Sequence, residues 1–135
     1  MDLPWLSRWQ PQLLALLRIV TALLFIEHGT VKLFAFPVPF QMPGELPPLL
    51  LAAAIIELVA GVLILIGLFT RPAAFIASGE MAVGYWMFHA PQAQWPVANM
   101  GEAAILFCFI FLYLAATGPG TWSVDGARDR NAPIR

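Results

Sequence analysis

Charged side chains are scarce in this sequence. They make up 11% of its 135 residues, whereas about 25% is usual for soluble proteins. Acidic and basic residues nearly cancel, to a formal net charge of -1, which excludes a nucleic-acid partner held by overall electrostatic attraction. Hydrophobic residues are correspondingly abundant, at 60% of the chain. The composition therefore places the protein among integral membrane proteins, with the lipid bilayer as its surroundings.

Cysteine and histidine are also scarce, and this limits metal and redox chemistry. Cys108 is the single cysteine, so the chain alone cannot form a dithiol redox pair or a cysteine-based zinc or iron–sulfur site. No H-x-x-E or E-x-x-H pair occurs. We therefore expect no metal site and no intrinsic cofactor. Two alternatives stay open: a metal held by His28, Glu57 and Glu102, whose side chains suit Zn, Mn or Fe, and a haem held by His28 and His89.

Apolar residues cluster into segments of membrane-spanning length, at about residues 13–36, 49–69, 73–89 and 97–117. A proline-rich stretch separates the first two segments, because proline cannot continue a helix. The short link Thr70-Arg71-Pro72 makes the second and third segments antiparallel neighbours. Residues 1–135 are thus predicted to form a single all-α domain, an integral membrane bundle of four transmembrane helices. Glycines in the second and third segments are expected to allow close helix contacts: Gly61, Gly67, Gly79 and Gly84.

The basic residues outside these segments all fall on one side of the predicted bundle. They are Arg8, Arg71, Arg128, Arg130 and Arg135. The positive-inside rule makes that side cytoplasmic, so we expect both termini in the cytoplasm. The first segment is longer than the hydrophobic region of a signal peptide and carries charged residues, so we expect it to stay in the mature protein.

Ionisable side chains inside the segments mark a site, because charge at membrane depth is costly and normally faces the bundle interior. Depth is counted along each helix at about 1.5 Å per residue. In the outer half, this count predicts a polar pocket built from His28, Lys32, Glu57, Asn99 and Glu102. In the inner half, Arg18 and Glu80 are predicted to form a structural ion pair.

The first segment also has a predicted inner face. At about 100° per residue, that face carries Arg18, Ala22, Phe25, Gly29 and Lys32. Glu27 points nearly opposite to Arg18. It therefore faces a different neighbour, a second subunit, or lipid in its protonated form.

The polar pocket has two main interpretations. In the first, it is a structural charge network in which Lys32 pairs with Glu57 or Glu102, and Asn99 caps or bridges. In the second, it opens toward the periplasm and takes a quinone headgroup, a small anion or a proton path. Lys32 would then be the cationic anchor, and Glu57 with His28 the proton-exchanging pair.

Several motifs, in this order, resemble the DoxX family of small four-helix membrane proteins. They are Arg18 followed by His28-Gly29-x-x-Lys32-Leu33-Phe34, Glu57-x-x-x-Gly61, Gly67-Leu68-Phe69-Thr70-Arg71-Pro72-Ala73, Asn99-x-x-Glu102, and Gly118-Pro119-Gly120-x-Trp122-Ser123-x-Asp125. The resemblance covers about residues 13–126. It implies a four-helix bundle in a bacterial-type inner membrane.

The resemblance also implies a function. The family takes its name from a membrane subunit associated with thiosulfate:quinone oxidoreduction. The chain is therefore expected to be a membrane subunit or partner of a quinone-linked oxidoreductase system, at most an accessory subunit, with quinone as the candidate ligand. Its expected partner is a soluble or membrane oxidoreductase subunit. The alternative is a non-catalytic scaffold, chaperone or lipid-binding protein whose buried charges are structural, and a homo-oligomer is compatible with either.

Overall fold

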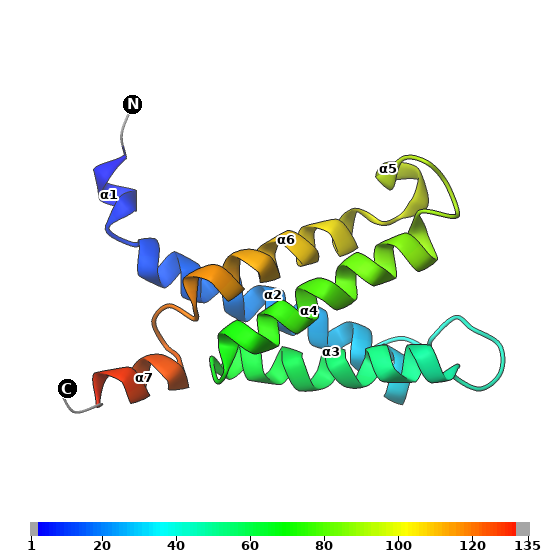
Figure 1. The fold of residues 1–135 in the computed structure, drawn as a ribbon, viewed down its shortest axis with the longest axis horizontal. Coiled ribbons are helices and arrows are strands. Elements are labelled where there is room, and N and C mark those ends of the chain that lie inside the picture. The colour runs from blue at the N-terminus through cyan, green and yellow to red at the C-terminus, as the bar shows by residue number, and fades with distance from the viewer. Residues whose placement is uncertain (1–2, 132–135) are drawn as a thin grey trace.

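The computed structural model describes residues 3–131 and contains helices and connecting loops in this part of the chain, with no strand. The helices are α1 (Pro4–Ser7), α2 (Gln10–Phe34), α3 (Pro48–Ile66), α4 (Thr70–Gly84), the π-helical turn η1 (Tyr85–His89), α5 (Pro96–Asn99), α6 (Glu102–Thr117) and α7 (Val124–Arg130). Figure 1 shows α2, α3, α4 and α6 as the long elements of one helical bundle. The all-α prediction is confirmed.

By length and composition, two helices of the described chain, α2 and α3, are apolar enough to cross a membrane. α6 is a shorter apolar helix. α4 runs directly into η1, so the chain stays helical from Thr70 to His89. The third predicted segment was placed at residues 73–89, and the helix begins earlier because Pro72 falls in its first turn, where a missing N–H breaks no helical hydrogen bond.

The fourth predicted segment is divided into two helices. Met100 has a φ of 58° and stands between α5 and α6, so residues 97–117 are not one continuous helix. The side-chain oxygen of Asn99 accepts a hydrogen bond from the Gly101 N–H at 2.8 Å and closes this turn. The break changes the direction of the chain immediately before Glu102.

The predicted inner face of α2 is confirmed. The buried residues of this helix are Ala15, Arg18, Thr21, Ala22, Phe25 and Gly29. Phe25 packs edge-on against Phe111 of α6, with ring centroids 4.7 Å apart. A Cβ at Gly61 would lie 2.6 Å from a side-chain carbon of Ile26, so α2 and α3 approach closely at this glycine, as expected.

Gly79 and Gly84 behave differently from this expectation. A Cβ added at either position would meet nothing within 4 Å. These two glycines of α4 therefore do not serve a close helix contact within the chain. Both face open space instead.

The start of α2, the end of α3, the start of α4, the end of α6 and all of α7 gather at one end of the molecule (Figure 1). We call it the terminal end. The loop between α2 and α3 and the short helix α5 lie at the opposite end. Arg71, Arg128 and Arg130 belong to elements of the terminal end, whereas Arg135 lies outside the described residues.

Arg18 is fully buried near the terminal end. Its guanidinium donates to the carbonyl oxygens of Ile64 and Leu65 at 2.9 and 2.7 Å. It also donates to those of Thr121 and Trp122 at 3.3 and 2.8 Å. Arg18 thus holds the C-terminal turn of α3 against the segment that precedes α7.

The ion pair predicted between Arg18 and Glu80 is not formed in the described part of the chain, where Lys32 and Glu57 make the salt bridge. The two terminal nitrogens of the Arg18 guanidinium instead donate to backbone carbonyls. Those of Ile64 and Leu65 belong to the C-terminal end of α3, where carbonyl groups carry partial negative charge.

Candidate functional site

The centre of the candidate site is an ion pair between α2 and α3. Lys32 Nζ donates to both carboxylate oxygens of Glu57, at 2.5 and 2.7 Å. The Glu57 side chain is 2% exposed and that of Lys32 14%. The depth count placed both residues in the outer half of the bundle, and Lys32 pairs with Glu57 rather than Glu102.

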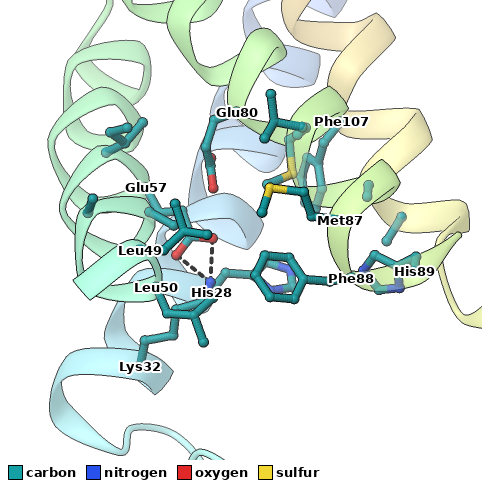
Figure 2. Close-up of a pocket in the computed structure, with 18 of the residues that line it drawn as sticks. His28, Lys32, Leu49, Leu50, Glu57, Glu80, Met87, Phe88, His89 and Phe107 are labelled. Atoms are coloured by element: carbon teal, nitrogen blue, oxygen red, sulfur yellow. Dashed lines mark hydrogen bonds and ion pairs between the residues drawn. The ribbon is translucent and has the colours of Figure 1, made fainter. Parts of the chain in front are cut away.

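A cavity of about 580 Å³ adjoins this pair. Its polar lining residues are His28, Lys32, Glu57, Glu80 and His89, and most of the others are apolar side chains of α3, α4 and η1. Phe40 and Met42, from the loop between α2 and α3, line it as well. The cavity therefore belongs to the half of the bundle away from the terminal end. Figure 2 shows the ion pair and Glu80 facing the same space.

Glu80 is the site residue that sequence reasoning misplaced. It was expected beside Arg18, but it lines the cavity together with Glu57. Its carboxyl group points into the cavity in Figure 2. Measured from the turn shared by α3 and α4, Glu57 and Glu80 lie about 14 and 15 Å along their helices. The earlier start of α4 is the signal that would have shown this.

Atom Oε2 of Glu80 is buried and has no hydrogen-bond partner among residues 3–131. Buried polar atoms in folded proteins are nearly always hydrogen-bonded, so an orphan of this kind requires an explanation. The carboxyl group that carries this oxygen points into the cavity (Figure 2), so a group entering the cavity would approach it. The Lys32–Glu57 pair, in contrast, is internally satisfied.

Both histidines border the cavity. The ring of His28 lies edge-on to Phe107, with centroids 5.7 Å apart. His89 Nδ1 lies 3.0 Å from the carbonyl oxygen of Asn99, within hydrogen-bond distance. His28 was predicted in the pocket, whereas His89 was named only as a haem ligand in one of the open alternatives.

Asn99 and Glu102 do not line the cavity, which corrects their assignment to the pocket. The Asn99 amide donates to the carbonyl oxygen of Ala93 at 2.9 Å, and its oxygen accepts from Gly101. Asn99 therefore caps a loop, one of the two structural roles expected for it. Glu102 opens α6 on the surface of the chain, although Met100, Ala103 and Ala104 beside it line the cavity.

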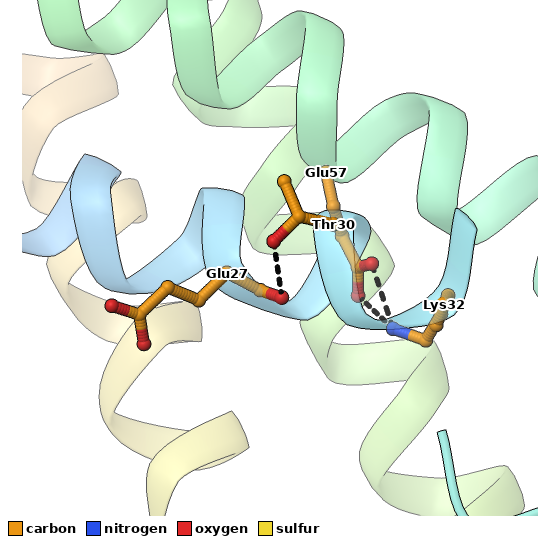
Figure 3. A network of polar contacts seen from close by, with 4 residues as sticks. All are labelled: Glu27, Thr30, Lys32 and Glu57. Atoms are coloured by element: carbon orange, nitrogen blue, oxygen red, sulfur yellow. Dashed lines mark hydrogen bonds and ion pairs between the residues drawn. The ribbon is translucent and has the colours of Figure 1, made fainter. Parts of the chain in front are cut away.

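Glu27 lies on the surface of α2. Its side chain points away from the Lys32–Glu57 pair (Figure 3). Its backbone carbonyl accepts a hydrogen bond from the Thr30 hydroxyl at 3.0 Å. The prediction that Glu27 is turned away from the Arg18 face is confirmed.

The arrangement favours a ligand with an apolar body and a small polar head. The apolar lining excludes water from the body, and the carboxyl and ammonium groups at one side provide directional contacts for the head. Within residues 3–131, no group of three or more His, Cys, Asp or Glu side chains is placed to hold a metal ion.

The family model described as DoxX matches residues 13–90. A Haemophilus influenzae relative, described as an uncharacterized protein, is 42% identical over 127 residues, covering 89% of this chain and 93% of the relative. The Escherichia coli inner membrane protein YphA is 35% identical over 127 residues, covering 86% and 90%. The Escherichia coli inner membrane protein YqjF is 31% identical over 114 residues, covering 80% and 85%. No solved structure matches the chain.

Proposed function

Because the chain belongs to the DoxX family of membrane proteins, as its motifs predicted, we propose that its cavity binds a quinone. The protein then serves as a membrane subunit or partner of a quinone-linked oxidoreductase system. The observation that carries this proposal is the Lys32–Glu57 pair, which borders a cavity of otherwise mainly apolar lining. A quinone combines these properties, since its ring and tail are apolar and its carbonyl oxygens accept hydrogen bonds.

We further propose that residues 1–135 form one domain that crosses a bacterial inner membrane four times, with both termini in the cytoplasm. The spans are α2, α3, α4 continued by η1, and α5 with α6. α4 and η1 together are about 30 Å long at 1.5 Å per residue, which matches the hydrocarbon core. The basic residues of the loops support this orientation, because the positive-inside rule assigns their side to the cytoplasm.

The polar groups have distinct roles in this proposal. Lys32 has a further N–H donor beyond those that Glu57 occupies, and this donor serves an oxygen of the bound head. Glu57 and His28 exchange protons with the bound head. With Cys108 as its single cysteine, the chain has no dithiol of its own, so electrons come from a partner subunit.

The alternative function is that of a non-catalytic scaffold, chaperone or lipid-binding protein. The same ion pair supports this alternative, because a salt bridge between α2 and α3 can have a purely structural role in holding the two helices together. The two functions predict different results when the pair is replaced by apolar residues of similar size. Quinone binding is lost if the pair holds the quinone, whereas a purely structural pair has no quinone binding to lose.

The deciding experiment uses the double variant Lys32→Met/Glu57→Leu. Replacing a buried pair by apolar groups often leaves stability unchanged, so this variant keeps the fold and removes the polar contacts. Wild type and variant are purified in native lipid, and bound quinone and co-purifying subunits are quantified. We expect quinone in the wild type and its loss in the double variant.

Glu27→Gln is the matched control, since it neutralises an acid that lies on α2 with Lys32 but points away from the pair (Figure 3). It should retain wild-type quinone. Absence of quinone and of any oxidoreductase subunit from the wild-type protein would overturn the redox proposal in favour of the scaffold.

A further inference from the structure

The cavity has an open side between α3 and α4. These helices diverge from their shared turn, as Figure 1 shows. Gly79 and Gly84 of α4 line the cavity, and neither would contact any neighbour through a Cβ. Nearby lining residues Ile76, Val83 and Met87 are 54%, 55% and 49% exposed. In the proposed membrane topology, this apolar opening faces lipid chains and not water.

We propose that this opening is a lateral portal through which an amphiphile enters from the bilayer, with its chain against Gly79 and Gly84 and its hydroxyl-bearing head on Glu80. The inference rests on the proposed function and specifies it, because the bound species is then the reduced, hydroxyl-bearing form of the quinone. Glu80 becomes the residue that selects this head.

The orphaned oxygen of Glu80 is the first support for a hydroxyl head. Atom Oε2 of Glu80 is buried and has no hydrogen-bond partner in residues 3–131, and the carboxyl group that carries it points into the cavity (Figure 2). A hydroxyl group both donates and accepts. It therefore satisfies this oxygen whichever protonation state Glu80 adopts, whereas a carbonyl head satisfies only a protonated carboxyl group.

The charge of the lining is the second support. The cavity has two carboxyl groups, Glu57 and Glu80, and one lysine. Both oxygens of Glu57 already engage that lysine. An anionic head such as a phosphate would approach these two acids, and the one lysine already neutralises Glu57, so a neutral head is favoured over a phospholipid.

The portal is tested by filling it. Gly79→Leu and Gly84→Leu add side chains where no atom lies within contact distance, so the fold tolerates them. Ala116→Leu is the control, on the exposed surface of α6 and away from the cavity lining. Dissociation constants are measured in nanodiscs for decylubiquinol, for its tail-free head, and for decyl alcohol. Thermal unfolding is measured on the same samples.

We expect the glycine variants to lower the affinity for decylubiquinol and for decyl alcohol about tenfold or more. The added side chains block the site of the apolar chain, which supplies most of the binding energy of these two probes. The tail-free head should change by less than about twofold, and the control should match wild type for every probe. Wild-type affinity for decylubiquinol in both glycine variants would overturn the portal.

Glu80→Leu and Glu80→Gln test the head. Leu removes the hydrogen-bonding group and should lower the affinity for decylubiquinol and for its tail-free head about tenfold. Gln keeps donor and acceptor atoms and should retain most of the affinity. Equal affinities for wild type and Glu80→Leu would refute the role of Glu80.

The probes separate this inference from the proposed function. If decylubiquinol fails to bind the wild type while decyl alcohol binds and is excluded by Gly79→Leu, the portal stands and the quinone function fails. If no tail-bearing probe binds the wild type, the portal is overturned as well.

Discussion

The Lys32–Glu57 pair shows how a single residue can decide whether this bundle holds together. Glu57 is almost fully buried, and both of its oxygens accept from Lys32. Transfer of an unpaired charge into a protein interior costs several kcal/mol, and the attraction within a pair repays that cost only while both partners are present. The net stabilisation from the intact pair is therefore smaller than the stability that is lost when only one partner is removed.

This asymmetry gives a stability prediction. Lys32→Met alone leaves the Glu57 carboxylate buried without its partner and should lower the free energy of unfolding by about 3–5 kcal/mol. Lys32→Met/Glu57→Leu should recover most of that loss, because no charge remains to be desolvated. Reversible unfolding in mixed detergent micelles measures both values. A double variant no more stable than the single one would contradict the argument.

At the scale of helices, side chains from other segments cap the helix ends. Arg71 donates to the carbonyl oxygens of Ala115 and Thr117 at 3.1 and 3.3 Å, and to that of Ala116 between them. These carbonyls close α6 and have no partners in its own backbone. Arg18 does the same at the end of α3. The arginines therefore connect helix termini rather than pairing with acids.

Asp125 caps the start of α4 in the same manner. Its carboxylate accepts hydrogen bonds from the N–H groups of Phe69 and Thr70 at 3.1 and 3.0 Å, and its own N–H donates to the Gly67 carbonyl at 2.8 Å. Burial acts to raise the pKa of Asp125, but the hydrogen bonds from Thr70 and Phe69 outweigh it and hold the pKa below its usual value.

The lowered pKa gives a prediction for pH dependence. The stability that Asp125 contributes is fully present above its unfolded pKa of about 3.9 and is lost as pH falls through the lower folded value. Asp125→Asn should remove this acid-sensitive component. Because its one remaining side-chain oxygen can still accept a hydrogen bond, the cost should stay below the roughly 1 kcal/mol of a lost helix cap. Hydrogen exchange at the Phe69 and Thr70 amides should accelerate in the variant.

Asp129→Asn provides the control, because Asp129 is an exposed acid of the same helix α7. Its exchange pattern and its stability between pH 3 and 5, roughly the range in which carboxyl groups titrate, should match the wild type. An equal effect of both substitutions would assign the pH response to net charge instead of to the cap.

Helix periodicity predicted much of this site and failed at identifiable points. The pattern around Arg18, Phe25 and Gly29 placed Lys32 on the inner face of α2, and the depth count brought it to Glu57. Glu80 was misplaced because a proline in the first turn hides the true start of α4. Arg18 was misassigned because its partners are backbone carbonyls, which charge counting does not include.

The break before α6 could not be predicted for a different reason. Met100 adopts a left-handed backbone conformation, with a φ of 58°, and such conformations are uncommon for residues other than glycine and asparagine. The common turn residues Asn99 and Gly101 flank Met100, but nothing in the sequence marks Met100 itself as the left-handed residue. The positions of Asn99 and Glu102 depend on it, so their removal from the pocket could be learned only from the structure.

At the scale of the whole molecule, charge is distributed unequally between the two ends. The loops contain arginine at the terminal end, whereas the loops of the opposite end contain neither lysine nor arginine. Glu45 lies in the opposite loop, between α2 and α3. Under the positive-inside rule, the cavity then belongs to the periplasmic half of the membrane, and its portal opens to lipids of the periplasmic leaflet.

This orientation predicts the outcome of cysteine labelling. In a Cys108→Ala background, Glu45→Cys should react with a membrane-impermeant maleimide in intact spheroplasts, because the proposed orientation places the loop between α2 and α3 in the periplasm. Asp129→Cys, in α7, should react only after the membrane is permeabilised. The reverse pattern would place the cavity in the cytoplasmic half. Labelling of both sites in intact spheroplasts would require an even number of spans between them, so one of α3, α4–η1 and α5–α6 would fail to cross.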